Sequence, residues 1–284
     1  MVRLDREQAK QVEIDLLQEA LFRFHGYDFR HYARASLTRR IDLQLRRNGL
    51  RNVSELIPLL LHDEAAFERF LSDMSISVTD MFRDPQFFRQ LRETVVPKLK
   101  TWPFIKIWCA GCATGEEVYS LAILLSEENF YDRSLIYATD YNRRSLAAAE
   151  EGIYSSAKIK KYTANYNNSG ARDSFANYYH AKYDLARMNE GLRKNIVFSH
   201  HNLATDSVFG EMNLILCRNV LIYFDQELQN RVLELFSASL CPGGFLCLGS
   251  KESLQFSSVA DQFEAIAKKE NIYRKIYPRQ EGEP

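Results

Sequence analysis

The sequence contains no long hydrophobic run. Its 284 residues include no stretch of about 18 consecutive apolar residues, the length that a membrane-spanning helix needs. The first residues, Met1 to Glu7, also lack the apolar core of a signal peptide. We therefore expect a cytoplasmic protein that does not insert directly into a membrane.

An excess of charge of one sign is absent as well. Lysine plus arginine and aspartate plus glutamate both total 37 residues. Without a global basic field, the chain lacks the electrostatics of a protein that binds nucleic acid non-specifically. Any charged partner must therefore meet a local patch on its surface.

Cysteine is scarce, with five residues spread along the chain. An odd number of cysteines without an export signal favours reduced thiols over a disulfide framework. The segment Trp108-Cys109-Ala110-Gly111-Cys112 does resemble the W-C-x-x-C motif of thioredoxin-like oxidoreductases. However, Gly115 delays the following helix, and Glu116 and Glu117 would disfavour a nearby thiolate. A metal site is not expected either, because a zinc site would need two more ligands at suitable spacing and a second C-x-x-C motif is missing.

The N-terminal part has the spacing of amphipathic helices, and no glycine- or proline-rich linker separates it from the rest. We predict an α-helical domain over residues 1–80 and a second domain over residues 81–284. Asp84-Pro85 marks the start of a helix near this boundary, with proline at the first helical position. Apolar residues at helical spacing are Val12, Leu16, Leu17, Ala20 and Leu21, followed by Leu37, Ile41 and Leu45.

Arginine is concentrated in this helical domain. Seven arginines lie between Arg30 and Arg51, against a single acid, Asp42. Four of them lie away from the apolar stripe and form a basic helix face: Arg39, Arg40, Arg46 and Arg47. This face is either a docking surface for an acidic partner or simply a solvated surface.

From Phe104 onward, short β-rich apolar runs alternate with helical stretches. This alternation is typical of a parallel sheet with helices on both faces. We predict strands at Phe104–Cys109, Ser134–Thr139, Asn195–Ser199, Asn213–Cys217, Phe245–Leu248 and Ile272–Ile276. Helices are predicted at Glu116–Glu128, Asn142–Glu150 and Asp225–Leu240. The stretch from Ala164 to Lys194 interrupts the rhythm and indicates either a small strand-bearing insertion or a long packed loop.

The first predicted strand is followed by a glycine-containing turn and a helix start. In α/β sheets ligands bind at the carboxyl ends of strands, where small residues let a ligand approach the backbone. Glu116 and Glu117 follow the turn, where they would repel a phosphate but suit a cation such as a sulfonium cofactor with an α-ammonium group. The alternative is an ordinary tight turn before a helix N-terminus that favours acids.

The second predicted strand ends in Asp140, 29 residues after Gly111. A separation of about 20–30 residues lets a carboxylate reach a ribose from the neighbouring strand. Together with the glycine-containing turn, Asp140 indicates a ligand that carries adenosine.

Several segments together resemble the CheR-type chemotaxis receptor methyltransferases. The two longest run from Ala110 to Ser120 and from Cys217 to Asp225, and shorter motifs follow the family's order. These are Ser77 to Asp84, Ala138-Thr139-Asp140, Asn202-Leu203 and Gly249-Ser250-Lys251-Glu252. The resemblance covers essentially the whole chain. It implies a Rossmann-like methyltransferase sheet that uses S-adenosylmethionine (SAM), an N-terminal α-helical domain and an inserted β-subdomain at about residues 164–200.

The resemblance also implies which residues contact SAM and its product S-adenosylhomocysteine (SAH). Asp140 would bind the ribose, Asn202 and Leu203 would flank the adenine, and Arg218 and Asn219 would close the methionine side. The other contacts would come from Ser77, Thr79, Arg83, Gly111 and the pair Glu116 and Glu117. The resemblance does not indicate which glutamate of the pair contacts the cofactor. Two positions depart from many family members, Ser77 in place of Asn and Val118 in place of Pro.

The implied reaction is methyl transfer to glutamate side chains of methyl-accepting chemotaxis receptors, in their cytoplasmic helical region. A glutamate with a pKa of about 4.3 is already an anionic nucleophile at neutral pH, so no general base is needed. Arg83 and Tyr223 are the catalytic candidates, because each could orient the carboxylate or the cofactor by hydrogen bonding. Arg218-Asn219-Val220 stands where amino-group methyltransferases carry D/N-P-P-Y/F, which argues against methylation of nucleic-acid bases.

Three of these residues also have a purely structural interpretation. Arg83 could pair with Asp80 or Asp84, Asn202 could cap a turn, and Tyr223 could be a core tyrosine. The alternative function for the whole chain is that of a catalytically silent sensor or scaffold that binds SAM or SAH.

Overall fold

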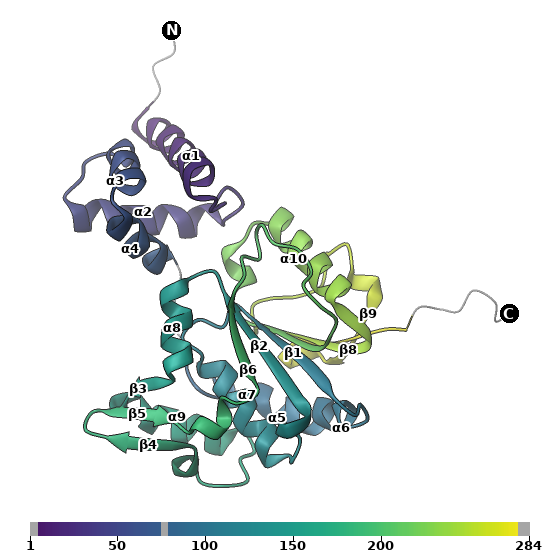
Figure 1. Ribbon diagram of the computed structural model, residues 1–284. Helices are drawn as coiled ribbons and strands as arrows, with labels where there is room; N and C mark the ends of the chain where they lie inside the picture. Colours follow the sequence, from purple (N-terminus) through teal and green to yellow (C-terminus); the bar gives the residue numbers. More distant parts are fainter. Residues whose placement is uncertain (1–4, 75–78, 278–284) are drawn as a thin grey trace, which may run out of the picture. The chain divides into compact units, whose positions relative to one another are not determined.

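The computed structural model describes residues 5–74 and 79–277, which form two compact units (Figure 1). The helical unit combines the N-terminal helices with residues 222–229, and the sheet unit contains the remaining residues. Among the described residues, no helix is both long and apolar enough to cross a membrane. Ser77, one of the predicted cofactor residues, lies outside the described residues.

The helical unit is built from α1 (Arg6–His25), α2 (Arg34–Asn48), α3 (Leu56–His62) and α4 (Glu64–Met74). Asp5 starts α1 with a capping box, in which Asp5 and Gln8 exchange side-chain and backbone hydrogen bonds. The buried side of α1 carries Ile14, Leu17 and Leu21. The predicted apolar stripe is therefore shifted: Leu17 and Leu21 are buried, whereas Val12 and Leu16 are exposed.

The predicted basic face of α2 is wrong for Arg40. Arg40 is only 5% exposed, its guanidinium donates to the carbonyl oxygen of Met74, and it lies over the ring of Tyr223. Its burial follows from helix geometry, because residues 37, 40, 41 and 44 share one face of a 3.6-residue repeat. Arg47 bonds Asp73, whereas Arg39 and Arg46 are exposed and line a shallow groove together with Arg34.

Residues 222–229 belong to the helical unit although the chain on either side belongs to the sheet unit. Two backbone hydrogen bonds attach this segment, from Ala33 N to Tyr223 O at 2.8 Å and from Asp225 N to His31 O at 2.8 Å. The imidazole Nδ1 of His31 also lies 3.0 Å from Asp225 Oδ2. No periodicity in the sequence predicts this attachment, since the pairs are separated by about 190 residues.

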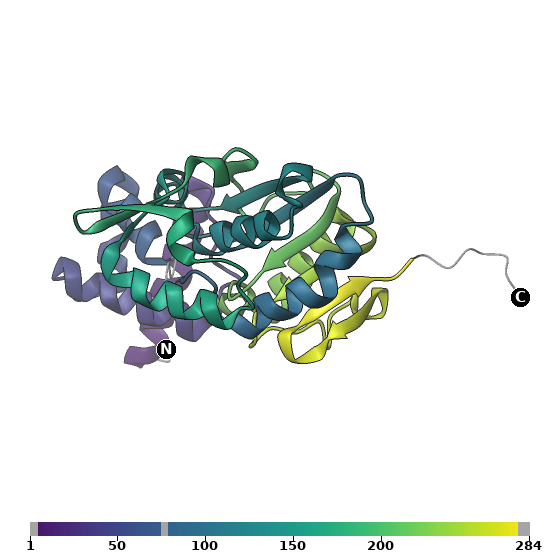
Figure 2. The ribbon, with the colours of Figure 1, turned by 90° about the horizontal axis from the view of Figure 1, so that it is seen from below.

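The sheet unit contains a seven-stranded sheet in the order β6-β2-β1-β7-β8-β10-β9. The strands are β1 (Ile105–Ala110), β2 (Ser134–Asp140), β6 (Ile196–His200), β7 (Met212–Cys217), β8 (Leu240–Leu248), β9 (Phe263–Ala267) and β10 (Ile272–Lys275). The pairs from β6 to β8 are parallel, as predicted, but β10 is antiparallel to both its neighbours. The strand predicted at Ile272–Ile276 is thus confirmed as β10, whereas β9 was not predicted. Figure 2 shows these last strands, in yellow, at one edge of the sheet.

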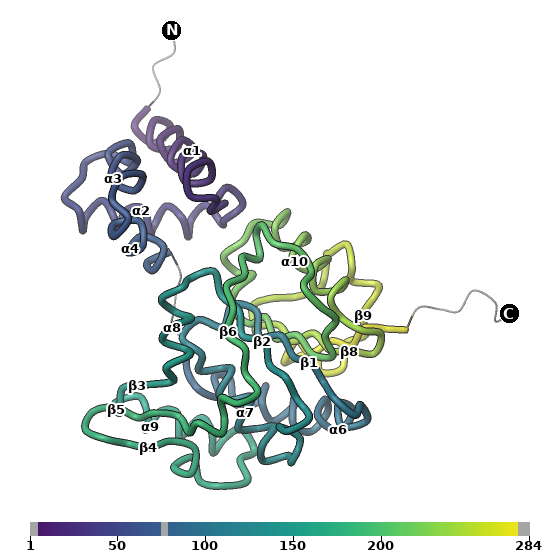
Figure 3. The backbone as a smooth tube through the Cα atoms, in the orientation of Figure 1, coloured from purple at the N-terminus to yellow at the C-terminus, as the bar shows by residue number. Residues whose placement is uncertain are grey.

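A small antiparallel sheet is inserted between α8 (Arg143–Glu151) and β6. It has the order β3-β5-β4, with β3 (Ile153–Ser155), β4 (Tyr179–Lys182) and β5 (Leu185–Met188), and α9 (Ser156–Asn168) lies between β3 and β4. Figure 3 traces this excursion of the backbone, in teal to green, from α8 through the small sheet to β6. The insertion therefore begins at about Ile153, earlier than the expected residue 164, and β6 belongs to the large sheet.

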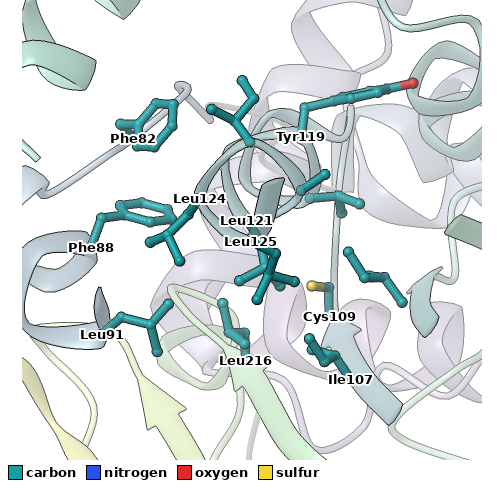
Figure 4. Packing of buried hydrophobic residues seen from close by; sticks show 14 of the residues in the cluster. Phe82, Phe88, Leu91, Ile107, Cys109, Tyr119, Leu121, Leu124, Leu125 and Leu216 are labelled. Atoms are coloured by element: carbon teal, nitrogen blue, oxygen red, sulfur yellow. The ribbon is translucent and has the colours of Figure 1, made fainter. Parts of the chain in front are cut away.

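Helices cover both faces of the large sheet, and their bounds lie close to the predicted ones. Besides α8, the helices α7 (Glu116–Glu127) and α10 (Gln226–Ser239) follow strands, and α5 (Pro85–Gln90) and α6 (Val96–Leu99) precede β1. Successive side chains of a strand point to opposite faces, so Ile107 and Cys109 meet α7 while Trp108 meets Phe236 of α10. Figure 4 shows the first of these contacts, with the leucines of α7 packed against Ile107, Cys109 and Leu216.

Candidate functional site

The carboxyl ends of β1, β2, β6 and β7 lie at the same edge of the large sheet. β1 is the point at which the strand order reverses, because its neighbours are β2, the next strand in the chain, and β7, which follows the inserted sheet. Ligands of open α/β sheets bind in the crevice outside such a switch point. Eight of the predicted cofactor residues end or follow one of these four strands, whereas Thr79 and Arg83 precede β1.

The turn after β1 has a left-handed backbone conformation at its glycine. Gly111 has a φ of +74°, and its N–H and that of Cys112 both donate to Thr139 O, at 2.8 and 2.9 Å. A Cβ at Gly111 would lie 2.5 Å from Cγ2 of Val220, which follows β7. Only glycine therefore fits here, since both the backbone conformation and the space exclude a side chain.

Asp140 is tied to this turn. Its Oδ2 accepts from Ala113 N at 2.9 Å and its Oδ1 accepts from Asn142 N at 2.9 Å. Burial raises the pKa of the Asp140 carboxyl, although the backbone donors Asn142 and Ala113 act in the opposite direction. Each carboxylate oxygen can accept more than one hydrogen bond, so Asp140 retains capacity for ribose hydroxyl groups.

The adjacent acids at the start of α7 have different surroundings. Glu116 is fully buried; Thr114 Oγ1 donates to its Oε2 at 2.6 Å, and Tyr162 Oη and Lys158 Nζ lie 3.1 and 3.4 Å from its Oε1. The side chain of Glu117 is 18% exposed and pairs with Arg218 at 2.7 Å. The protein thus occupies both oxygens of Glu116 and leaves Glu117 the more accessible of the two.

Arg218 links three parts of the site. Its Nη1 donates to Glu117 and its Nη2 donates to Asp84 Oδ2 at 2.8 Å, while the guanidinium lies 3.9 Å from the ring centre of Phe87. The side chain is 2% exposed, and its Nε is buried with no hydrogen-bond partner among the described residues. One cation is therefore shared by two carboxylates, which leaves negative charge at the turn.

Arg83 and Thr79 are half-buried on the loop that precedes α5. Phe82 and Asp84, on either side of Arg83, both have left-handed φ angles of 50° and 56°. The acids considered as partners of Arg83 bond other cations, Asp80 with Lys161 at 2.6 Å and Asp84 with Arg218. The helix start predicted at Pro85 is confirmed, but the Asp84 side chain makes no cap hydrogen bond and pairs with Arg218 instead.

Asn202 and Leu203 lie directly after β6. Asn202 Oδ1 accepts from Ala204 N at 3.0 Å, and Asn202 N donates to Asp206 Oδ2 at 2.9 Å. Asn202 therefore caps a turn, the structural alternative considered for it. Leu203 is 7% exposed, and a contact of this pair with an adenine stays a prediction.

Tyr223, the second catalytic candidate, lies in the helical unit. The Arg40 guanidinium lies 4.9 Å from the centre of its ring. Its proposed catalytic role stays a prediction from the sequence resemblance.

The thiols of the W-C-x-x-C segment are not suited to redox chemistry. Cys109 and Cys112 are buried free cysteines. Burial raises the pKa of both thiols well above the usual value, and the nearby Glu117 and Asp140 charges raise it further. A thiolate nucleophile is thus disfavoured here.

Several residues that support the site were absent from the predicted set. Tyr154 Oη donates to Thr114 O at 2.8 Å, and Tyr162 and Lys158 reach Glu116 from α9. Glu252 accepts hydrogen bonds from the backbone of residues 219 and 220. A family motif contains Glu252 without indicating its role, whereas the aromatics of the insertion carry no sequence signal of a connection to the turn.

The family models match both parts of the chain. Residues 77–272 match the CheR methyltransferase SAM-binding domain, and residues 13–75 match the CheR methyltransferase all-alpha domain. A Pseudomonas putida relative named Cher3 is 51% identical over 95% of this chain and 98% of its own length. Chemotaxis protein methyltransferase 2 of Pseudomonas aeruginosa is 30% identical, with 89% of each chain covered. A chemotaxis protein methyltransferase of Listeria innocua is 31% identical over 81% of this chain and 85% of its own. The resemblance seen in the sequence motifs is thereby confirmed: the chain belongs to the CheR methyltransferase family, with an all-alpha domain followed by a SAM-binding domain.

Proposed function

We propose that this protein transfers a methyl group from SAM to glutamate side chains of methyl-accepting chemotaxis receptors, forming methyl esters. Membership of a family whose relatives are named chemotaxis protein methyltransferases supports the substrate class. The receptor's cytoplasmic helical region would present the glutamates, so we infer that the protein acts in the cytoplasm.

The charge balance at the start of α7 is the main structural support for SAM as the cofactor. Glu116, Glu117 and Asp84 are three carboxylates, and within residues 5–74 and 79–277 their ion pairs involve two cations, Arg218 and Lys158. Accessible carboxylates at this edge of the sheet, with side-chain exposures of 18% for Glu117 and 46% for Asp84, favour a cationic ligand. A sulfonium cofactor with an α-ammonium group has this property.

The residues of the site fit SAM in distinct roles. Gly111 would keep the turn in its left-handed conformation against Val220, Asp140 would accept from the ribose hydroxyls, and Glu117 would hold the ammonium group. Arg218 would fix Glu117 in place through their 2.7 Å ion pair. Of the two adjacent acids, we assign the cofactor contact to Glu117, because Glu116 is fully buried and bonded to protein groups.

When bound, SAM supplies a methyl group on a sulfonium, which a nucleophile can displace directly. A glutamate carboxylate needs no deprotonation at neutral pH, so the protein's contribution is to position it and to exclude water. Arg83, held between two residues with left-handed backbone, is our candidate for orienting the carboxylate. Replacing Arg83 with Ala should lower the rate of transfer while circular dichroism shows an unchanged fold.

Labelled methyl transfer to receptor tests the proposal. A methyl ester is hydrolysed by mild alkali, whereas a methylated amine is stable, so raising the pH should release volatile labelled methanol. Label that survives alkali would contradict a carboxylate acceptor. SAH binding by calorimetry without any transfer would instead indicate the silent sensor or scaffold.

A further inference from the structure

The carboxylate of Glu252 is buried beside the segment that follows β7. The residue is 6% exposed, in the loop after β8. Its Oε2 accepts from Gly249 N at 2.6 Å and from Asn219 N at 2.9 Å, and its Oε1 accepts from Val220 N at 2.8 Å. Three backbone donors thus converge on one side chain and use both of its oxygens.

This arrangement fixes an unusual backbone conformation. Asn219 has a φ of +62°, in the left-handed region that side chains disfavour. A Cβ at Gly249 would lie 2.7 Å from both Asn219 N and Glu252 Oε2, so the approach of the two loops requires glycine at this position. The loops after β7 and β8 are therefore held together by Glu252 and by the absence of a side chain at Gly249.

The same segment borders the cofactor turn on two sides. Arg218, one residue before Asn219, pairs with Glu117 and Asp84. Val220, one residue after it, fills the space beside Gly111, where a Cβ would come within 2.5 Å of Val220 Cγ2. A change in the backbone at Asn219 would therefore displace both the Arg218 guanidinium and the neighbour of Gly111.

We propose that Glu252 is a positioning residue of the SAM site. Its carboxylate holds Asn219 and Val220 in the conformation that places Arg218 between two acids and packs Val220 against the turn at Gly111. The inference rests on the proposed function, since it assumes that this turn and Glu117 bind the cofactor. Glu252 would act on the cofactor through Arg218 and Val220, without touching it.

The test compares SAH affinity with thermal stability in matched variants. Glutamine keeps the shape of Glu252 but has a single acceptor oxygen, and its amide N–H groups would face a backbone donor. Glu252→Gln should therefore weaken SAH binding about tenfold or more in calorimetry, and raise the KM for SAM more than it lowers kcat. Glu252→Asp, which keeps the charge, should bind SAH better than Glu252→Gln.

Glu128→Gln is the control, because Glu128 is similarly buried but lies at the other end of α7. It should lower the melting temperature and leave SAH affinity unchanged. Gly249→Ala places a side chain against Glu252 and Asn219, so it disturbs the same contact and should also weaken SAH binding. This variant tests the proposal if Glu252→Gln does not fold. Wild-type SAH affinity in these folded variants, whatever their melting temperatures, would overturn the proposal. Failure of the proposed function would give a different result, namely no methyl transfer to receptor by the wild-type protein. The effect of Glu252 on SAH affinity could still be measured in that case.

Discussion

The two ends of α7 carry the same sequence feature, a pair of adjacent glutamates, in opposite electrostatic settings. At its C-terminal end Glu127 and Glu128 meet three cations, Arg92, Lys100 and Arg172. Tyr166 and Tyr178 also donate to Glu127. At its N-terminal end Lys158 pairs with Glu116, and Arg218 is shared between Glu117 and Asp84.

This difference distinguishes a structural ion cluster from the proposed cofactor site. Burying charges is tolerable when each is paired and hydrogen-bonded, as at the C-terminal end. An incompletely compensated acid costs stability unless a ligand supplies the missing charge. The identical residue pair thus stabilises the fold at one end of the helix and suits a cationic cofactor at the other.

Truncation of Glu128, at the C-terminal end of α7, should give the largest effect on stability. Glu128→Ala leaves Arg92, Lys100 and Arg172 without one of their acids in a buried setting, so we expect a loss of about 3 kcal/mol in the free energy of unfolding. Urea denaturation measures this loss. SAH affinity should be unchanged, because the 12-residue helix separates Glu128 from the cofactor turn by about 18 Å. A large loss of affinity in the folded variant would break the distinction between the two ends.

Neutralising the accessible acid at the other end should give the opposite pattern. Glu117→Gln removes the charge that we assign to the ammonium group, so SAH binding should weaken by about 1.5–3 kcal/mol in calorimetry. Asp140→Ala should weaken it by a similar amount through the ribose. Unchanged SAH affinity in either variant would remove that residue from the site.

Acid should weaken the compensated end by protonation of Glu128. Burial opposes ionisation of this carboxyl, but the hydrogen bonds from Lys100 and Arg92 hold its pKa below the usual value. Its contribution to stability is therefore fully present above the unfolded-state pKa and is lost as the pH falls through the lower folded-state pKa. The pH dependence of the free energy of unfolding between about pH 5 and pH 3 should be less steep in Glu128→Gln. An equally steep loss in this variant would assign the acid sensitivity to other carboxyls.

The smallest effect should come from the exposed arginines of α2. A double change of Arg39 and Arg46 to Glu should raise the KM for receptor several-fold at low salt and leave SAH affinity unchanged. Exposed charges are screened over about 8 Å at physiological ionic strength, so they accelerate encounter more than they tighten a complex. Arg47→Glu serves as the matched control, because Arg47 already pairs with Asp73. Receptor methylation at the wild-type rate by the double variant would leave these arginines as a solvated surface.

Much of this architecture follows from local sequence. The alternation of apolar strands and helices predicted β1, β2, β6 and β7 within one or two residues, because burial of strand and helix faces requires those periods. β8 instead begins at Leu240, five residues before its predicted start. Pro85 began its helix as predicted. The glycine-containing turn and Asp140 were predicted to share one edge of the sheet, and they follow and end the parallel neighbours β1 and β2. The antiparallel direction of β10 and the start of the insertion at Ile153 depend on which strands pair, and no local period encodes that choice.

The sequence by itself determined that an acidic pair follows a glycine turn and that the family's motifs occur in order. Only the tertiary structure decided that Glu116 is buried and bonded to protein groups, whereas Glu117 is the more accessible of the two acids. Adjacent residues on a helix point about 100° apart, so Glu116 and Glu117 cannot share one environment. Tyr162 and Lys158, which occupy Glu116, come from a helix more than 40 residues further along the chain. Distance along the chain also hides the roles of Arg40 and Glu252. Arg40 bonds Met74, 34 residues away, and Glu252 bonds the backbone of Asn219 and Val220, 33 and 32 residues away.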